Sequence, residues 1–146
     1  MNELVTVSLL TLCFSLLSLV IVKQDVKVYY DPIIKKLSDD LERIYPDIKK
    51  HNIIILGAND TFTENKKKIF ICLRKKDGEY YDYHTLLYIS LHELAHVLTE
   101  AYDNHGDQFN KTFSALLLKA KNIGLYDETK KIKYDYCGTK HLSKDK

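Results

Sequence analysis

Residues 92–96 read His92-Glu93-Leu94-Ala95-His96, and this pentapeptide decides how the chain is interpreted. Residues four apart on an α-helix lie one turn apart on the same face, so His92 and His96 can point their imidazoles at one metal ion. Zinc with three protein ligands keeps a fourth position open for water and lowers the pKa of that water to about 7. A neighbouring carboxylate can accept the proton as the water attacks a carbonyl group. The spacing therefore predicts a zinc hydrolase in which Glu93 is the general base.

The sequence on both sides of the motif predicts a single helix over residues 84–101. This segment contains neither glycine nor proline, and Asp82 just before it is a candidate N-cap. Its apolar residues recur at helical spacing, which predicts one buried face; they are Leu87, Leu91, Leu94, Leu98 and Ala101. In this context, two surface histidines that happen to lie four residues apart are the weaker interpretation.

His105 is the predicted third ligand. It lies nine residues after His96 in a turn-rich segment, and Gly106 allows the backbone to reverse sharply after it. The competing oxygen donors are Glu100, Asp103 and Asp107. Nitrogen donors are the more usual zinc ligands, so we expect one Zn²⁺ ion held by the three histidines.

Residues 92–96 and 105–109, which read HELAH and HGDQF, resemble the WLM and SprT-like group of minimal zincin metalloproteases. In that group the sequence HELAH is followed by a short connector and then by HGxxF at the start of a helix. The likeness covers roughly residues 70–140 and is specific at the motif. It is closest to the short WLM-type proteins of large DNA viruses.

This resemblance implies a peptidase in which His92, His96 and His105 hold zinc and Glu93 acts as the base. Cellular members of the group also have tails that bind DNA or ubiquitin-like modifiers. No such tail is recognisable in this sequence, so a role in clearing proteins crosslinked to DNA is not expected.

Residues 4–22 are nineteen residues without a charged side chain. A helix of that length is about 28 Å long, close to the thickness of the hydrocarbon core of a bilayer, so we expect a transmembrane helix. A cleaved signal peptide is the main alternative, but the segment lacks a basic start and a small-x-small cleavage site. A buried core helix is a third possibility.

Lysines follow this segment and none precedes it, which predicts that the soluble domain of a single-pass membrane protein faces the cytoplasm. If the viral likeness holds, the interior of a virion is the equivalent location. Residues 23–139 are long enough for one zincin-like domain, and residues 140–146 form a polar tail.

The formal net charge of +2 is weak and scattered, so we expect no nucleic-acid-binding surface. The expected partners are a peptide or protein substrate and, through residues 4–22, a membrane. The sequence does not indicate an oligomeric state.

Hydrophobic periodicity predicts an α+β fold, with a small mixed sheet packed on the HExxH helix of a minimal zincin-like domain that follows the transmembrane helix. The other expected elements are a helix after Asp31-Pro32 that ends near Pro46, strands at 53–56 and 68–74, a helix over 109–120 closed by Gly124, and a last strand at 131–136. Residues 69–74 are the candidate edge strand for pairing with an extended peptide.

Two other functions stay open. Some zinc-dependent ribonucleases use three histidines at loosely similar spacing, but they lack a glutamate directly after the first. A non-catalytic, membrane-tethered zinc-binding module would close the fourth zinc position with a protein ligand, for which Cys137 is the candidate.

The roles of Cys72 and Cys137 also stay open. They could form a disulfide or remain reduced, and Cys72 could instead be a metal ligand or a nucleophile. A tyrosine at position 102, 134 or 136 could donate a hydrogen bond to the oxyanion of the tetrahedral intermediate, although most tyrosines of the chain are expected to pack.

Overall fold

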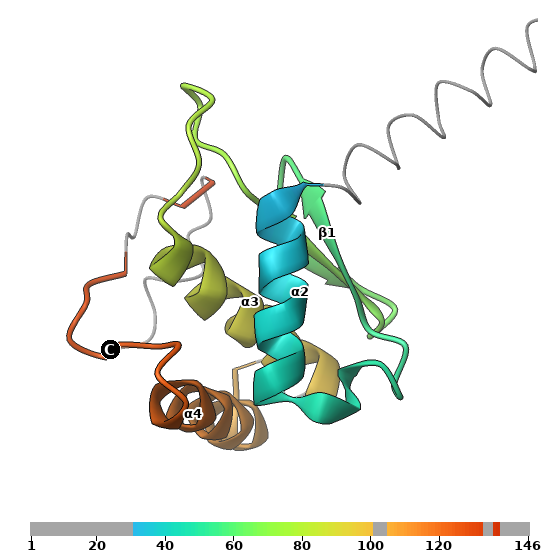
Figure 1. The fold of residues 1–146 in the computed structure, drawn as a ribbon. Helices are drawn as coiled ribbons and strands as arrows, with labels where there is room; N and C mark the ends of the chain where they lie inside the picture. The colour runs from blue at the N-terminus through green and yellow to red at the C-terminus, as the bar shows by residue number, and fades with distance from the viewer. Residues whose placement is uncertain (1–30, 101–104, 133–135, 138–146) are drawn as a thin grey trace, which may run out of the picture.

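The polypeptide forms an α+β fold in a computed structural model that describes residues 31–100, 105–132 and 136–137 (Figure 1). The elements in chain order are helix α2 (Pro32–Ile44), a short 3-10 helix η1 (Pro46–Ile48), strands β1 (Ile54–Ala58), β2 (Phe62–Glu64) and β3 (Lys68–Cys72), and helices α3 (Tyr83–Leu98) and α4 (Asp107–Asn122).

Helix α2 begins and ends where the sequence predicts. The Asp31 carboxylate accepts a hydrogen bond of 2.8 Å from the backbone N–H of Ile33, and Pro32 occupies the first helical position. The helix ends at Ile44 because Pro46 restricts the residue before it to extended backbone. Its apolar face is buried and consists of Ile34, Leu37, Leu41 and Ile44.

The sheet is mixed and has the strand order β1-β3-β2. Strand β1 is parallel to β3, with Ile55 opposite Ile69, and β2 is antiparallel to β3, with Thr63 opposite Ile69. Strand β2 was not predicted, because no strand was expected between the predicted strands at 53–56 and 68–74. Asn65 and Lys66 at the turn between β2 and β3 both have positive φ angles, of 52° and 53°.

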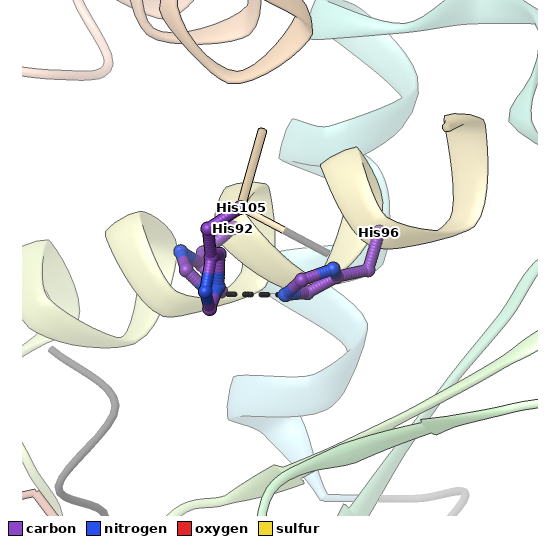
Figure 2. Close-up of side chains that lie close together, drawn as sticks. All are labelled: His92, His96 and His105. Atoms are coloured by element: carbon purple, nitrogen blue, oxygen red, sulfur yellow. Dashed lines mark hydrogen bonds between the residues drawn. The ribbon is translucent and has the colours of Figure 1, made fainter. Parts of the chain in front are cut away.

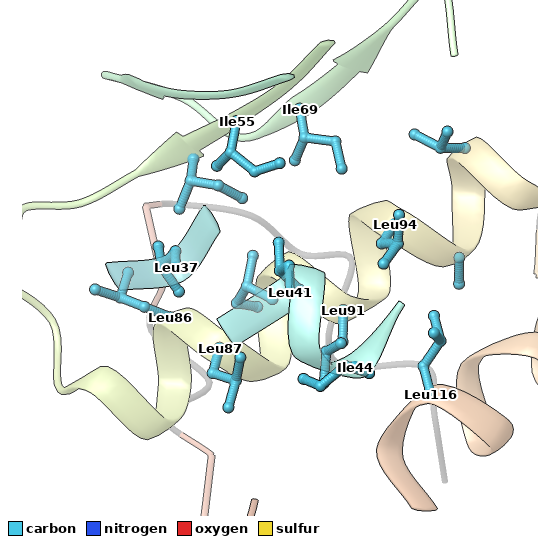
Figure 3. Packing of buried hydrophobic residues seen from close by; sticks show 14 of the residues in the cluster. Leu37, Leu41, Ile44, Ile55, Ile69, Leu86, Leu87, Leu91, Leu94 and Leu116 are labelled. Carbon is cyan, nitrogen blue, oxygen red and sulfur yellow. The ribbon is translucent and has the colours of Figure 1, made fainter. Parts of the chain in front are cut away.

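Helix α3 lies at the centre of the molecule. It packs against β2 and β3 on one side and also contacts α2 and α4 (Figure 1). In Figure 3, Ile55 and Ile69 point from the sheet toward the helices, and both are buried. The α3 leucines that fill the space between the layers are 0 % exposed; they are Leu86, Leu87, Leu91 and Leu94. The HExxH motif is therefore on the most enclosed helix of the fold.

Two predicted boundaries differ from the structure. Helix α3 ends at Leu98, and Thr99 after it is extended, so the helix is shorter than the predicted 84–101. The predicted strand at 131–136 is wrong for the residues that can be compared, since residues 131, 132 and 136 are not in a strand. Residues 133–135 lie outside the described part of the chain.

The prediction of a transmembrane helix, and with it of a single-pass membrane protein, requires correction. None of the helices in the described residues is long and apolar enough to cross a membrane. The longest of them, α3 and α4, have 16 residues each. A helix of that length spans about 24 Å, less than the roughly 30 Å hydrocarbon core of a bilayer. The apolar segment 4–22 lies outside the described residues.

Candidate metal centre

Helix α3 presents the first two histidines of the site. The helix is capped by Asp82, whose carboxylate accepts hydrogen bonds from the backbone N–H of Thr85 at 2.9 Å and from its hydroxyl at 3.0 Å. The helix is regular through the motif, so His92 and His96 lie one turn apart on the same face. His92 is buried, with 3 % of its surface exposed, and His96 is half-buried.

His105 reaches the same place from the start of α4. Gly106 is the N-cap residue of α4, so His105 directly precedes that helix. The side-chain amide of Asn110 donates a hydrogen bond of 3.1 Å to the His105 carbonyl oxygen, which holds the backbone at this position. Figure 2 shows the three imidazoles converging from the two helices.

The spacing of the imidazole nitrogens fits one tetrahedral zinc ion. The Nε2 atom of His92 lies 3.2 Å from that of His96 and 3.1 Å from that of His105. Two Zn–N bonds of about 2.05 Å at the tetrahedral angle would place their nitrogens about 3.3 Å apart. The candidate ligand atoms of the three residues all lie within 4.8 Å of one another. The structure thus brings the three predicted ligands together at distances suitable for one zinc ion.

The competing oxygen donors do not join this group. Among the described residues, the group that could hold a metal ion contains the three histidines and no carboxylate. Glu100 is exposed, and its backbone N–H donates to the side-chain oxygen of Gln108 at 3.4 Å. Asp107 is exposed in the first turn of α4, and Asp103 lies outside the described residues.

Phe109 packs against all three histidines. Its ring centroid lies 4.9 Å from that of His92, 4.4 Å from that of His96 and 4.7 Å from that of His105. Phe113, one turn further along α4, contacts only His92 among the three, at 5.3 Å. Phe109 is 0 % exposed. From the sequence, Phe109 was expected at the start of the next helix and as part of the HGxxF likeness, and its contact with the histidines was not predicted.

Glu93 directly follows His92, and its carboxylate accepts a hydrogen bond from β2, a strand that was not predicted. The hydroxyl of Thr63 on β2 donates a hydrogen bond of 2.8 Å to Oε2 of Glu93. Burial raises the pKa of the Glu93 carboxyl, and the hydrogen bond from Thr63 opposes that rise. Thr63 carried no signal in the sequence, because it is a single threonine between two predicted strands.

Cys72 and Cys137 form a disulfide between β3 and the C-terminal part of the chain. Neither sulfur is therefore available as a thiolate ligand or nucleophile. Next to it, the Tyr136 hydroxyl donates a hydrogen bond of 2.6 Å to the Cys72 carbonyl oxygen and lies 2.9 Å from the hydroxyl of Thr61. The single hydroxyl proton of Tyr136 is thus already used, which makes it a poor donor to an oxyanion.

The predicted edge strand is misplaced. Strand β3 pairs with β1 on one side and β2 on the other, so residues 68–72 are in the interior of the sheet. The outer strand beside Glu93 is β2, which among the described residues pairs with β3 alone. A peptide that extends the sheet next to the histidines would therefore pair with β2.

The comparisons with known proteins point to one family. The model of the WLM domain matches residues 35–146, which is most of the chain. Relatives come from large DNA viruses and are described as uncharacterized proteins. Protein 136R of Invertebrate iridescent virus 6 is 46 % identical over 80 residues, covering 53 % of this chain and 44 % of the relative. Protein 042R of Invertebrate iridescent virus 3 is 36 % identical over 111 residues, covering 75 % of this chain and 69 % of the relative.

A third relative, protein R325 of Acanthamoeba polyphaga mimivirus, is 37 % identical over 89 residues, covering 56 % of this chain and 43 % of the relative. The matches to 136R and R325 thus span less than half the length of those two proteins. No solved structure matches the chain significantly. The resemblance to WLM-type proteins of large DNA viruses is confirmed.

Proposed function

This chain belongs to the WLM domain family, and we propose that it is a zinc-dependent metallopeptidase that hydrolyses peptide bonds with Glu93 as the general base. The observation that carries the proposal is the convergence of three imidazoles, with the Nε2 atoms of His96 and His105 at 3.2 Å and 3.1 Å from that of His92, next to the half-buried carboxylate of Glu93. Zinc held by His92, His96 and His105 would polarise a substrate carbonyl and make a water more acidic.

The residues of the chain supply the remaining functions. Glu93 accepts a proton from the attacking water and delivers it to the leaving amine. Phe109 keeps the three imidazole rings in place and excludes water from beneath them. The edge of β2 that has no partner strand among the described residues holds an extended substrate through backbone hydrogen bonds, so the substrate class is a peptide or an unfolded protein segment.

The two alternative functions have less support. A non-catalytic zinc module needs a fourth protein ligand, and its candidate, Cys137, is bonded to Cys72. A three-histidine ribonuclease has no need for a glutamate directly after the first histidine, whereas Glu93 lies in that position and accepts a hydrogen bond from Thr63.

Metal analysis and peptide cleavage by the purified full chain test the proposal. We expect one zinc per chain in wild type, in Glu93→Gln and in Glu100→Gln. Glu100→Gln is the matched control, because it removes an exposed carboxylate near the site that does not belong to the histidine group. Cleavage of casein or of a peptide library should fall by about 100-fold or more in Glu93→Gln and stay unchanged in Glu100→Gln. Equal cleavage by wild type and Glu93→Gln, or absence of zinc from all three proteins, would contradict the proposal.

A further inference from the structure

We propose that Thr63 is a positioning residue, which fixes the orientation of the Glu93 carboxylate for proton transfer. This inference rests on the proposed peptidase function and adds a residue to it. Thr63 is in a strand of three residues, and its hydroxyl is the donor nearest to the base at 2.8 Å.

The carboxylate of Glu93 depends on this one contact. Among the described residues, Thr63 is the side chain that donates a hydrogen bond to it, and the bond involves Oε2. A glutamate side chain has three rotatable bonds and samples several rotamers unless a partner holds it. The hydrogen bond from Thr63 restrains the position of Oε2, while Oε1 accepts no hydrogen bond from the described residues and remains available to accept a proton.

The side chain of Thr63 is well suited to hold a fixed direction. Threonine is branched at Cβ, which restricts its χ1 angle on a strand. Side chains alternate between the two faces of a strand. Because Thr63 points toward α3, its neighbours Phe62 and Glu64 lie on the opposite face. On that face Phe62 stacks on Phe70 of β3, with ring centroids 4.5 Å apart, which strengthens the pairing of the short strand.

Residues on both sides of β2 form hydrogen bonds with other parts of the molecule. Before the strand, the Thr61 hydroxyl accepts a hydrogen bond of 2.8 Å from the Cys72 backbone N–H and lies 2.9 Å from the Tyr136 hydroxyl. After the strand, the Lys66 ammonium donates to the carbonyl oxygen of Thr99, the C-cap residue of α3. Strand and helix are therefore joined at two places, through Thr63 and through Lys66. This arrangement maintains the distance between the hydroxyl and Glu93.

The Thr63 hydroxyl could instead serve only as a hydrogen-bond partner for the half-buried Glu93 carboxylate, and the two roles predict different kinetics. A residue that orients the base acts on the chemical step, so its loss lowers kcat with little change in KM. A residue that only stabilises the fold lowers the amount of folded protein and leaves the kcat of the folded fraction unchanged.

The test compares Thr63→Val, which keeps the shape and removes the hydroxyl, with Thr63→Ser, which keeps the hydroxyl. Thr129→Val, at an exposed threonine outside the site, is the matched control. Cleavage kinetics, zinc content and thermal stability are measured on the full chain. We expect Thr63→Val to bind one zinc and to lose about 10- to 100-fold in kcat with KM within about twofold of wild type. Thr63→Ser should retain kcat within about threefold of wild type.

A second measurement is independent of activity. A double-mutant cycle of Thr63→Val with Glu93→Ala, followed by denaturant unfolding of the zinc-free chain, should give a coupling of about tenfold in the unfolding equilibrium constant. A kcat of Thr63→Val within twofold of wild type, or equal losses in Thr63→Ser and Thr63→Val, overturns the positioning role while the peptidase function stands. A wild-type chain that binds zinc and cleaves nothing overturns the peptidase function, and the positioning role with it.

Discussion

Replacement of Phe109 by leucine should lower zinc affinity more than replacement of Phe113 by leucine. Both replacements should lower the free energy of unfolding to a similar extent. The Phe109 ring contacts all three histidines, whereas Phe113 contacts His92 alone among them. Both phenylalanines are buried on the same face of α4, with 0 % and 7 % of their surfaces exposed. Phe113→Leu is therefore a matched control for the loss of a buried ring.

The magnitude follows from these contacts. Each variant loses buried apolar volume, at a cost of about 1–3 kcal/mol in the free energy of unfolding. An aromatic pair contributes about 0.5–1.5 kcal/mol beyond the buried area. Phe109→Leu breaks two more ring contacts with histidines than Phe113→Leu, so the imidazoles lose about 1–3 kcal/mol more of orienting interaction. We expect zinc affinity to fall about 10- to 100-fold in Phe109→Leu and less than about tenfold in Phe113→Leu.

Competition with a zinc chelator measures the affinity of each variant, and thermal unfolding of the zinc-free chains measures the fold. Comparable unfolding temperatures together with a lower zinc affinity only in Phe109→Leu would agree with the prediction. Equal zinc affinity in Phe109→Leu and Phe113→Leu would refute the reasoning, because the three ring contacts would then contribute nothing to the orientation of the ligands.

Asp40→Asn should lower the free energy of unfolding by about 2 kcal/mol at neutral pH. Burial alone would raise the pKa of Asp40, but hydrogen bonds and charges from α2 and Tyr83 hold it below its usual value. This stabilisation is present above the unfolded-state pKa of about 3.9 and is lost as the pH falls through the lower folded-state pKa, so the difference between variant and wild type should vanish in acid unfolding curves. Serine at both Cys72 and Cys137 removes a crosslink across 65 residues and should cost about 2–4 kcal/mol in denaturant unfolding, and an unchanged midpoint would contradict this. Zinc at 100 times its dissociation constant should stabilise the chain by about 2.7 kcal/mol, and calorimetry should find no such effect in His105→Ala.

The sequence was sufficient to predict the elements that have a local signal. The cap of α2 at Asp31, the end of that helix before Pro46 and the histidine pair all depend on residues at most four positions apart. His105 lies further away, but the turn residues around it are also local. A prediction of this kind succeeds because the physical cause, a helix turn or a cap, lies within one short segment.

Strand β2 and the contact of Thr63 with Glu93 have no such local cause. A strand of three residues is too short to show an alternation of polar and apolar side chains, and Asn65 after it is typical of a turn. The strand forms because it pairs with β3, and the Thr63 hydroxyl contacts Glu93, a residue thirty positions later in the chain. Metal ligands on one helix can therefore be recognised from spacing, whereas the group that orients the base depends on how a neighbouring strand pairs. In this fold that strand is β2, which forms the outer strand of the sheet in the described part of the chain and places Thr63 against Glu93.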